Sequence, residues 1–153
     1  MRRKEREIKD PDIIHEILSQ SSICRLAIHD EPYPYLVPMN FGYRNNALYF
    51  HCATGGRKLD LLKQNNKVGF EIEYDSQLIK GDVACQWTTK YRSIIGTGEM
   101  NIITNDDEKR EGFDIIMQQH GKHDNTYIQA ALDKALVLKL EINSLSAKQA
   151  GDW

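Results

Sequence analysis

The residues whose types and spacing could do chemistry gather in one segment, residues 47–62, which reads Ala-Leu-Tyr-Phe-His-Cys-Ala-Thr-Gly-Gly-Arg-Lys-Leu-Asp-Leu-Leu. It begins with β-forming residues, breaks at Gly55 and Gly56, and restarts as a helix at Arg57 or Lys58. The free N–H groups of a helix N-terminus, beside two cations, can bind an anion such as phosphate. Strand–glycine–helix connections are also common without any ligand, so the segment predicts a phosphate site only together with other features.

A second group of candidate residues lies near the start of a predicted strand over residues 91–103. Arg92 and Ser93 could join Arg57 and Lys58, because two cations and a hydroxyl suit a dianionic phosphate. The side chains that could meet a flat heterocycle are Phe41, Trp87 and Tyr91 as walls, and Asn40 and Gln86, with backbone groups near Pro38, as polar partners. The convergence of these groups would form a site for a phosphorylated cofactor.

Metal and hydrolytic chemistry find less support in the sequence. Of the five histidines, only His120 and His123 are close together, and they flank Gly-Lys in a predicted loop, so we expect no metal site. No serine lies in a nucleophile-elbow pattern. Cys52 and Cys85 could be nucleophiles, but buried structural cysteines are commoner and the sequence shows no base positioned to activate either thiol.

Length and composition indicate a single soluble domain over residues 1–153. The chain is 41% hydrophobic and 27% charged, and its net charge of −2 gives no reason to expect nucleic acid or an anionic membrane as a partner. Three cysteines without a Cys-x-x-Cys pair fit neither a disulfide framework nor a zinc site, and they suit a reducing cytoplasm. No apolar signal region or membrane-spanning run is visible. We therefore expect a cytoplasmic protein with no membrane partner.

The hydrophobic pattern predicts strands over 22–29, 33–43, 47–53, 68–74, 91–103 and 135–142 and helices over 11–20, 57–65, 107–120 and 126–133. The polar residues 75–83 are expected to form a loop. Asn45 and Asn46 would turn strand 33–43 back onto 47–53, although three prolines mark the first strand as an edge or an interrupted strand. Strands in hairpin-like succession favour a mainly β fold, a six-stranded antiparallel barrel with peripheral helices.

Five blocks of sequence, in order, carry a resemblance to a known family. They are Met-Arg-Arg-Lys-Glu-Arg-Glu-Ile at 1–8, Ile-Cys-Arg-Leu-Ala at 23–27, Pro-Tyr-Leu-Val-Pro-Met-Asn-Phe-Gly-Tyr at 34–43, Leu-Tyr-Phe-His-Cys-Ala-x-x-Gly-Arg-Lys at 48–58, and Cys-x-Trp-Thr-x-x-Tyr-Arg-Ser-Ile-Ile-Gly-x-Gly at 85–98. The chain resembles the flavin-binding split-barrel superfamily typified by pyridoxamine 5′-phosphate oxidase. Within it, the nitroimidazole-resistance (Nim-type) flavoproteins look most similar.

The resemblance implies a split β-barrel homodimer with flavin mononucleotide (FMN) at the subunit interface. A small barrel filled by its own side chains has no room for a flavin, which also favours a site between two subunits. By this resemblance Lys58 would hold the phosphate, with help from Arg57 and the segment 91–93, and Gln86 and Trp87 would lie near the ring. The implied cofactor-binding residues are Pro38, Met39, Asn40, Phe41, His51, Ala53, Arg57, Lys58, Gln86, Trp87, Tyr91, Arg92 and Ser93.

The same resemblance implies a function, an FMN-dependent oxidoreductase that reduces small electrophiles such as nitro-aromatics. Its partners would be a second subunit and a small-molecule electron acceptor. His51 is the candidate catalytic residue, because the matching histidine of Nim-type relatives faces the flavin pocket; it could equally be a hydrogen-bonded wall residue. The alternative is a protein that binds or senses a flavin, haem or deazaflavin without turnover. Vitamin B6 oxidation is a third option, which the short chain disfavours.

Overall fold

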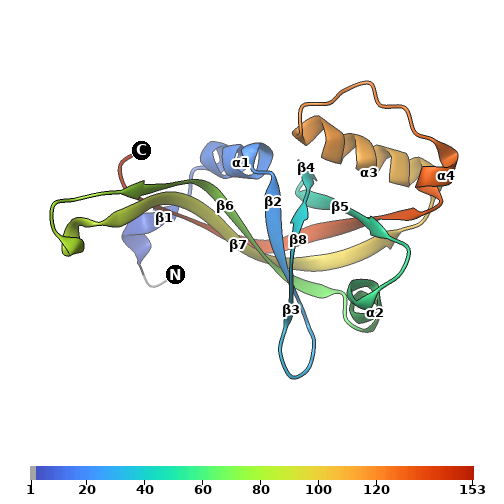
Figure 1. Cartoon of the computed structure of the whole chain (residues 1–153), viewed down its shortest axis with the longest axis horizontal. Helices are drawn as coiled ribbons and strands as arrows, with labels where there is room; N and C mark the ends of the chain where they lie inside the picture. Colours follow the sequence, from blue (N-terminus) through green and yellow to red (C-terminus); the bar gives the residue numbers. More distant parts are fainter. Residues whose placement is uncertain (1–2) are drawn as a thin grey trace.

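The computed structural model describes residues 3–153, which form one curved antiparallel sheet with helices around it (Figure 1). The strand order is β3-β2-β6-β7-β8-β5-β4, and β1 pairs with β8. The strands are β1 (Glu7–Ile8), β2 (Ile23–Ile28), β3 (Tyr35–Asn40), β4 (Gly42–Arg44), β5 (Ala47–Ala53), β6 (Lys67–Ile79), β7 (Thr88–Ile103) and β8 (Ala135–Ala150). The helices are α1 (Pro11–Gln20), α2 (Arg57–Gln64), α3 (Asp106–Gln119) and α4 (Gln129–Leu132), with short 3-10 turns η1 (Lys4–Arg6) and η2 (Ala84–Gln86).

The mainly β architecture with peripheral helices is confirmed, and the local signals that predict each helix act as expected. In α1, Pro11 occupies the first turn, the Asp10 carboxylate accepts from the Asp12 N–H at 2.9 Å, and Ile17 and Leu18 are buried in the core. Helices α2 and α3 agree with the predicted ranges to within one residue at each end, whereas α4 is shorter than predicted.

The predicted hairpin of 33–43 with 47–53 is wrong for its first half. The segment divides at Phe41: β3 pairs with β2, and only β4 pairs with β5, through the Asn45–Asn46 turn. Both asparagines have positive φ angles, 51° and 59°, as a tight hairpin turn requires. The division has a packing cause, because Phe41 is fully buried and the backbone of Gly42 lies directly against α3. A Cβ on Gly42 would come within 2.6 Å of the Ile115 carbonyl.

A long two-stranded arm, formed by the end of β6, η2 and the start of β7 (residues 75–91), is the second departure from the predicted fold. Residues 75–79, expected to be loop, continue β6. After a register shift between Tyr74 and Gln77, residues 77–79 pair with the first residues of β7. The arm extends away from the helices and ends at η2 (Figure 1). Its side chains are exposed, so no hydrophobic alternation marks it as strand. Strand β8 likewise continues to Ala150 rather than ending at 142, and with β1 and the divided strand the predicted six strands become eight.

Within residues 3–153, none of the helices combines the length and the apolar character that crossing a membrane requires.

Candidate functional site

The sheet is split where the chain crosses from β3 to β4. Strand β3 pairs only with β2, and residues 50–53 of β5 pair only with β8, because β4 covers no more than residues 47–49. Each of these strands therefore has one edge whose backbone N–H and C=O groups are not used by the sheet. Helix α2 follows directly after β5 and connects the two edges, since Lys58 reaches Met39 on β3.

The N-terminus of α2 is open. Gly56 is the N-cap residue at φ 119°, without a side-chain cap, and its carbonyl accepts from the N–H groups of Leu59 and Asp60. The N–H groups of Arg57 and Lys58, in the first turn, have no partner within the helix. Among residues 3–153, no atom lies within 4 Å of a Cβ built on Gly55 or Gly56, so the glycine turn before these groups is open.

The two cations of this turn are in different electrostatic states. Arg57 forms an ion pair with Asp30, and its guanidinium lies 5.8 Å from the ring centroid of Tyr35. The Lys58 Nζ lies 3.2 Å from the Met39 sulfur, which is only a weak acceptor, and no carboxylate of residues 3–153 lies within 4 Å of it. Lys58 is therefore the half-buried, uncompensated cation at the split, and the predicted help from Arg57 is reduced by its ion pair.

His51 lies on β5, two residues before the end of the strand. Its ring centroid is 5.8 Å from that of Phe113 on α3, and Phe113 in turn lies 5.7 Å from the ring of Tyr127. Desolvation by the surrounding residues, and secondly the positive charge of Lys58, lower the pKa of His51 below its usual 6.5. The imidazole is thus neutral at pH 7, with one nitrogen able to donate and the other able to accept a hydrogen bond.

The cysteines near this site are not activated. Burial raises the pKa of the Cys52 thiol, and the nearby charge of Lys58 only partly opposes that effect. Burial is also the main reason that the pKa of Cys24 is raised to about 12. Because a thiolate is the reactive form, neither thiol is a nucleophile at neutral pH.

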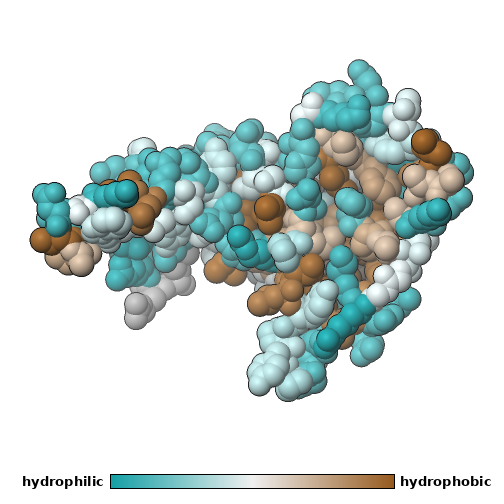
Figure 2. Space-filling view, in the orientation of Figure 1, coloured by the Kyte–Doolittle hydropathy of each residue, from teal (hydrophilic) through white to brown (hydrophobic). Residues whose placement is uncertain are grey.

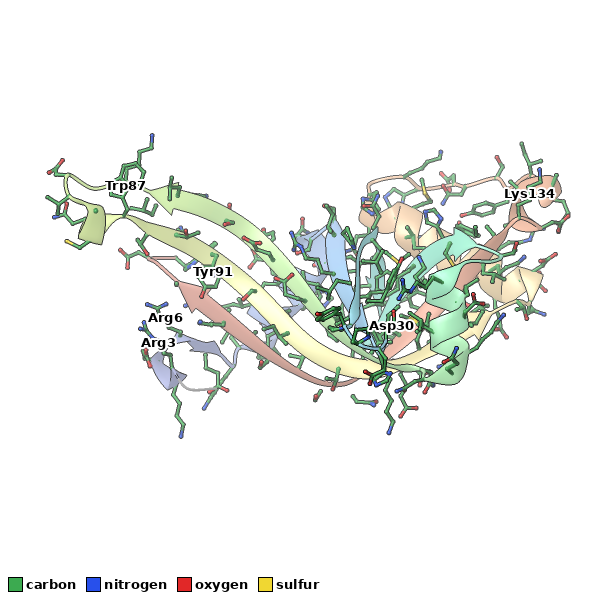
Figure 3. All side chains as sticks on the ribbon, turned by 60° about the horizontal axis from the view of Figure 1, so that its bottom comes forward. Arg3, Arg6, Asp30, Trp87, Tyr91 and Lys134 are labelled. Atoms are coloured by element: carbon green, nitrogen blue, oxygen red, sulfur yellow. The ribbon has the colours of Figure 1, made fainter. Side chains whose placement is uncertain are left out.

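The predicted convergence of the two basic clusters is wrong within a single chain. On β8, Ala135 pairs with Ala53, which precedes α2, whereas Gln149 pairs with Arg92. These two positions on β8 are 149 − 135 = 14 residues apart, which corresponds to roughly 46 Å of strand length at the usual rise of about 3.3 Å per residue. Figure 3 shows Trp87 and Tyr91 along the arm and Asp30 apart from them, near the middle of the molecule.

Several predicted site residues use their side chains within the chain. The Gln86 Oε1 accepts from the Asp82 N–H at 2.9 Å, and the Trp87 Nε1 donates to the Gly81 carbonyl at 2.8 Å, so both hold the tip of the arm. Trp87 remains 47% exposed, and the Lys80 Nζ lies 5.9 Å from its ring centroid.

The side chains of Arg92 and Phe41 also make their contacts within the chain. The Arg92 guanidinium pairs with Glu16 on α1 at 3.1 Å and lies 4.1 Å from the ring centroid of Trp153. Phe41 is fully buried, with its ring centroid 6.3 Å from that of Phe50, so its ring presents no exposed face as a wall for a heterocycle in this structure. Neither the Asp30–Arg57 pair nor the Trp153–Arg92 contact has a sequence signal, because both join residues far apart in the chain.

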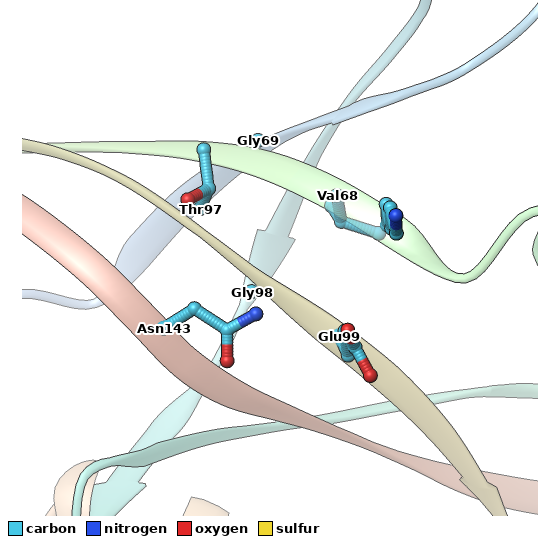
Figure 4. A pocket seen from close by; sticks show the side chains of 7 residues that line it. Val68, Gly69, Thr97, Gly98, Glu99 and Asn143 are labelled. Atoms are coloured by element: carbon cyan, nitrogen blue, oxygen red, sulfur yellow. The ribbon is translucent and has the colours of Figure 1, made fainter.

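The face of the sheet that carries Leu36 and Ile95 is not covered by a helix. An apolar hollow there is lined by residues of β2, β3, β6 and β7, and it adjoins a more polar cavity of about 430 Å³ around Gly69, Thr97 and Asn143 (Figure 4). Leu36 is 68% exposed and Ile95 is 62% exposed. Figure 2 shows hydrophobic residues gathered where β2 and β3 cross β6 and β7.

Comparisons with known proteins identify the fold and the family of the chain. No curated protein sequence matches the chain. Among solved structures, a protein from Bacteroides thetaiotaomicron for which a role in 5-nitroimidazole antibiotic resistance has been proposed shares 32% sequence identity at a TM-score of 0.83, over 94% of this chain and 86% of that one.

Two more distant structures share the fold alone. An FAD- and haem-binding protein from Mycobacterium smegmatis is 19% identical at a TM-score of 0.84, over 97% of this chain and 75% of that one. A flavocytochrome from Azotobacter vinelandii is 16% identical at a TM-score of 0.83, over 99% of this chain and 72% of that one.

A family model described as pyridoxamine 5′-phosphate oxidase matches residues 10–149. The chain therefore belongs to the pyridoxamine 5′-phosphate oxidase family, with its split-barrel fold.

Proposed function

We propose that the chain is an FMN-dependent oxidoreductase that reduces small electrophiles such as nitro-aromatics. The observation that carries the proposal is the uncompensated Lys58 ammonium beside the open N-terminus of α2, at the split between two unpaired strand edges. Membership of the family supports a flavin, and the relative with a proposed role in nitroimidazole resistance supports this class of electron acceptor. The family name by itself does not transfer the vitamin B6 reaction to this chain.

The residues at the split fit the two ends of FMN. Lys58 and the first N–H groups of α2 provide donors and positive charge for the phosphate. The free edge of β3 provides backbone donors and acceptors for the polar edge of the ring, with Pro38 contributing only a carbonyl. Asn40 and Ala53 are exposed beside these edges. Bound FMN would supply the electron chemistry, while the protein binds and orients it and shields it from water.

His51 is assigned to the substrate side of this site. Its neutral imidazole, next to Phe113, can hydrogen-bond a polar group of a planar substrate without adding a charge. In this role it orients the substrate, and it is not a cationic acid at pH 7.

A homodimer is part of the proposal, because a single chain does not complete the site. Trp87, Gln86 and Ser93 lie on or beside an arm that is far from Lys58 of the same chain, and such an arm can reach a second copy. The uncovered face around Leu36 and Ile95 provides an apolar surface for self-association. In this arrangement the arm of one subunit would contribute Trp87, Gln86 and Ser93 to the FMN held by Lys58 of the other.

The alternative function is a protein that binds a flavin or haem without turnover. The fold likeness to the FAD- and haem-binding protein and to the flavocytochrome is the observation that favours it.

Reoxidation kinetics test the proposed reaction. The FMN-loaded protein, reduced chemically without oxygen, should be reoxidised faster by a 5-nitroimidazole than by buffer alone, with return of the flavin absorbance bands. An identical rate with and without the nitro compound would contradict the reductase function and support the binding alternative.

Replacing Lys58 tests the position of the phosphate. Lys58→Ala should weaken FMN binding about tenfold or more, because a charge-assisted hydrogen bond contributes about 1.5–3 kcal/mol. Riboflavin, which lacks the phosphate, should bind both proteins equally. The matched control is Arg57→Ala, which should change FMN affinity less because Arg57 is already paired with Asp30. An unchanged FMN dissociation constant in Lys58→Ala would mean that the phosphate lies elsewhere.

Charged substitutions on the uncovered face test the dimer. Leu36→Asp and Ile95→Asp should shift the protein towards monomer in sedimentation velocity experiments, because each would place a carboxylate in an apolar interface. Ile128→Asp is the control, since Ile128 is 77% exposed before α4, away from this face. A wild-type chain that sediments as a monomer would rule out the dimer.

The titration of His51 tests the electrostatic coupling at the site. Lys58→Met should raise the pKa of His51, because it removes a positive charge that disfavours the imidazolium, while desolvation should keep that pKa below 6.5. The shift can be followed by NMR of the imidazole protons against pH. Arg57→Met should leave the pKa of His51 unchanged. If both variants behave alike, Lys58 does not lie beside His51.

A further inference from the structure

A separate group of hydrogen-bond donors lies where η1, β7 and β8 meet. We call Arg6, Tyr91 and Lys148 the arm-base cluster. Lys148 is the register partner of Ser93 on β7 and of Glu7 on β1. Because paired residues of antiparallel strands point to the same face, Lys148 shares a face with Ser93, and so does Tyr91 two positions earlier. Figure 3 shows Arg3, Arg6 and Tyr91 on this side of the arm.

The three side chains of the cluster are half-buried. The Lys148 Nζ lies 5.7 Å from the ring centroid of Tyr91. Hydrogen bonding to Lys148, with a smaller contribution from Arg6, lowers the pKa of Tyr91 despite the opposing effect of its burial. A phenol O–H, an ammonium and a guanidinium are all donors, and together they match an oxyanion.

Carboxylates lie near this cluster, but within residues 3–153 none of them forms an ion pair with Arg6 or Lys148. In residues 3–9, Arg3, Lys4, Arg6 and Lys9 outnumber Glu5 and Glu7, and the Glu7 carboxylate is 3.6 Å from Lys9. The other nearby carboxylates are Glu73, which is the register partner of Ser93 on β6, and Asp152, which follows β8. Lys90 adds a further cation, held over Trp153. No carboxylate of the described residues lies within 4 Å of the Arg6 or Lys148 charge.

We infer that the arm-base cluster is a second anion-binding site, which holds the phosphate or carboxylate group of the small molecule that exchanges electrons with the flavin. The site is distinct from that of Lys58, which lies near the opposite end of β8. Ser93 lies on the same face as the cluster, and the proposed dimer brings Ser93 to the FMN held by the other subunit. The cluster would therefore lie beside that FMN, and this part of the inference rests on the proposed function. The cluster thus selects anionic substrates over neutral ones.

The ionisation of Tyr91 reports on the site without any flavin. The tyrosinate absorbance of the full-length apoprotein is titrated with and without inorganic phosphate, and the same titration of Tyr91→Phe isolates the Tyr91 signal. Bound phosphate should raise the pKa of Tyr91, because a second negative charge disfavours the phenolate. In the double variant Arg6→Gln/Lys148→Gln, the phosphate concentration that gives half of this shift should increase about tenfold or more. The control Lys134→Gln removes an exposed cation at the far end of the molecule and should change nothing (Figure 3).

Insensitivity of Tyr91 to phosphate, or an unchanged midpoint in the double variant, would overturn the anion site whether or not the protein binds a flavin. The flavin measurements then identify the ligand. The double variant should bind FMN and riboflavin as the wild type does. Loss of FMN affinity with unchanged riboflavin affinity would instead assign the cluster to the cofactor phosphate and overturn the substrate assignment.

Turnover provides the substrate measurement. The double variant should raise the KM for 4-nitrobenzoate about tenfold with little change in kcat, and it should leave the KM for an uncharged nitroimidazole unchanged. Equal effects on both acceptors would contradict a site for the anionic group.

Discussion

The structure depends on one crossing of the chain, at Phe41 and Gly42. Phe41 fills the core, and the backbone of Gly42 lies so close to α3 that no side chain fits between them. This packing forces β3 and β4 into different parts of the sheet, so that each of β3 and β5 keeps an unpaired edge. These edges stay unpaired because the barrel is not closed. A continuous 33–43 strand paired along its length would use those backbone groups for the sheet itself.

Charge at the split is divided in a way that favours one ligand position. Asp30 neutralises Arg57, which fixes the loop after β2 to the start of α2. Within residues 3–153, the Met39 thioether is the only hydrogen-bond acceptor for the Lys58 ammonium. An ammonium without a carboxylate partner is stabilised by an anion that binds next to it, and the open glycine turn leaves space for that anion. The same charge adds to desolvation in lowering the pKa of His51, so the proposed phosphate site and the proposed substrate side are electrostatically connected.

Sequence alone predicts most of the elements and the Gly55–Lys58 turn, because those features depend on local chemistry: caps, glycines and periodic apolar residues. It does not predict the division at Phe41, whose cause is contact with a helix some 70 residues later. The arm is missed for another reason, since its strands are exposed on both faces and carry no alternation. The predicted convergence of Lys58 with Arg92 fails within one chain because the sequence does not reveal how far β8 extends, and Arg92 pairs near the far end of that strand.

The central claim is that the split holds FMN with its phosphate at Lys58. The most direct test is an equilibrium titration of the apoprotein with FMN and with riboflavin, followed by absorbance and by the NMR signals of His51. The account predicts one FMN per chain, bound about tenfold or more tightly than riboflavin, with a shift of the His51 signals. A protein that takes up neither flavin, or that binds both equally without any change at His51, would contradict it.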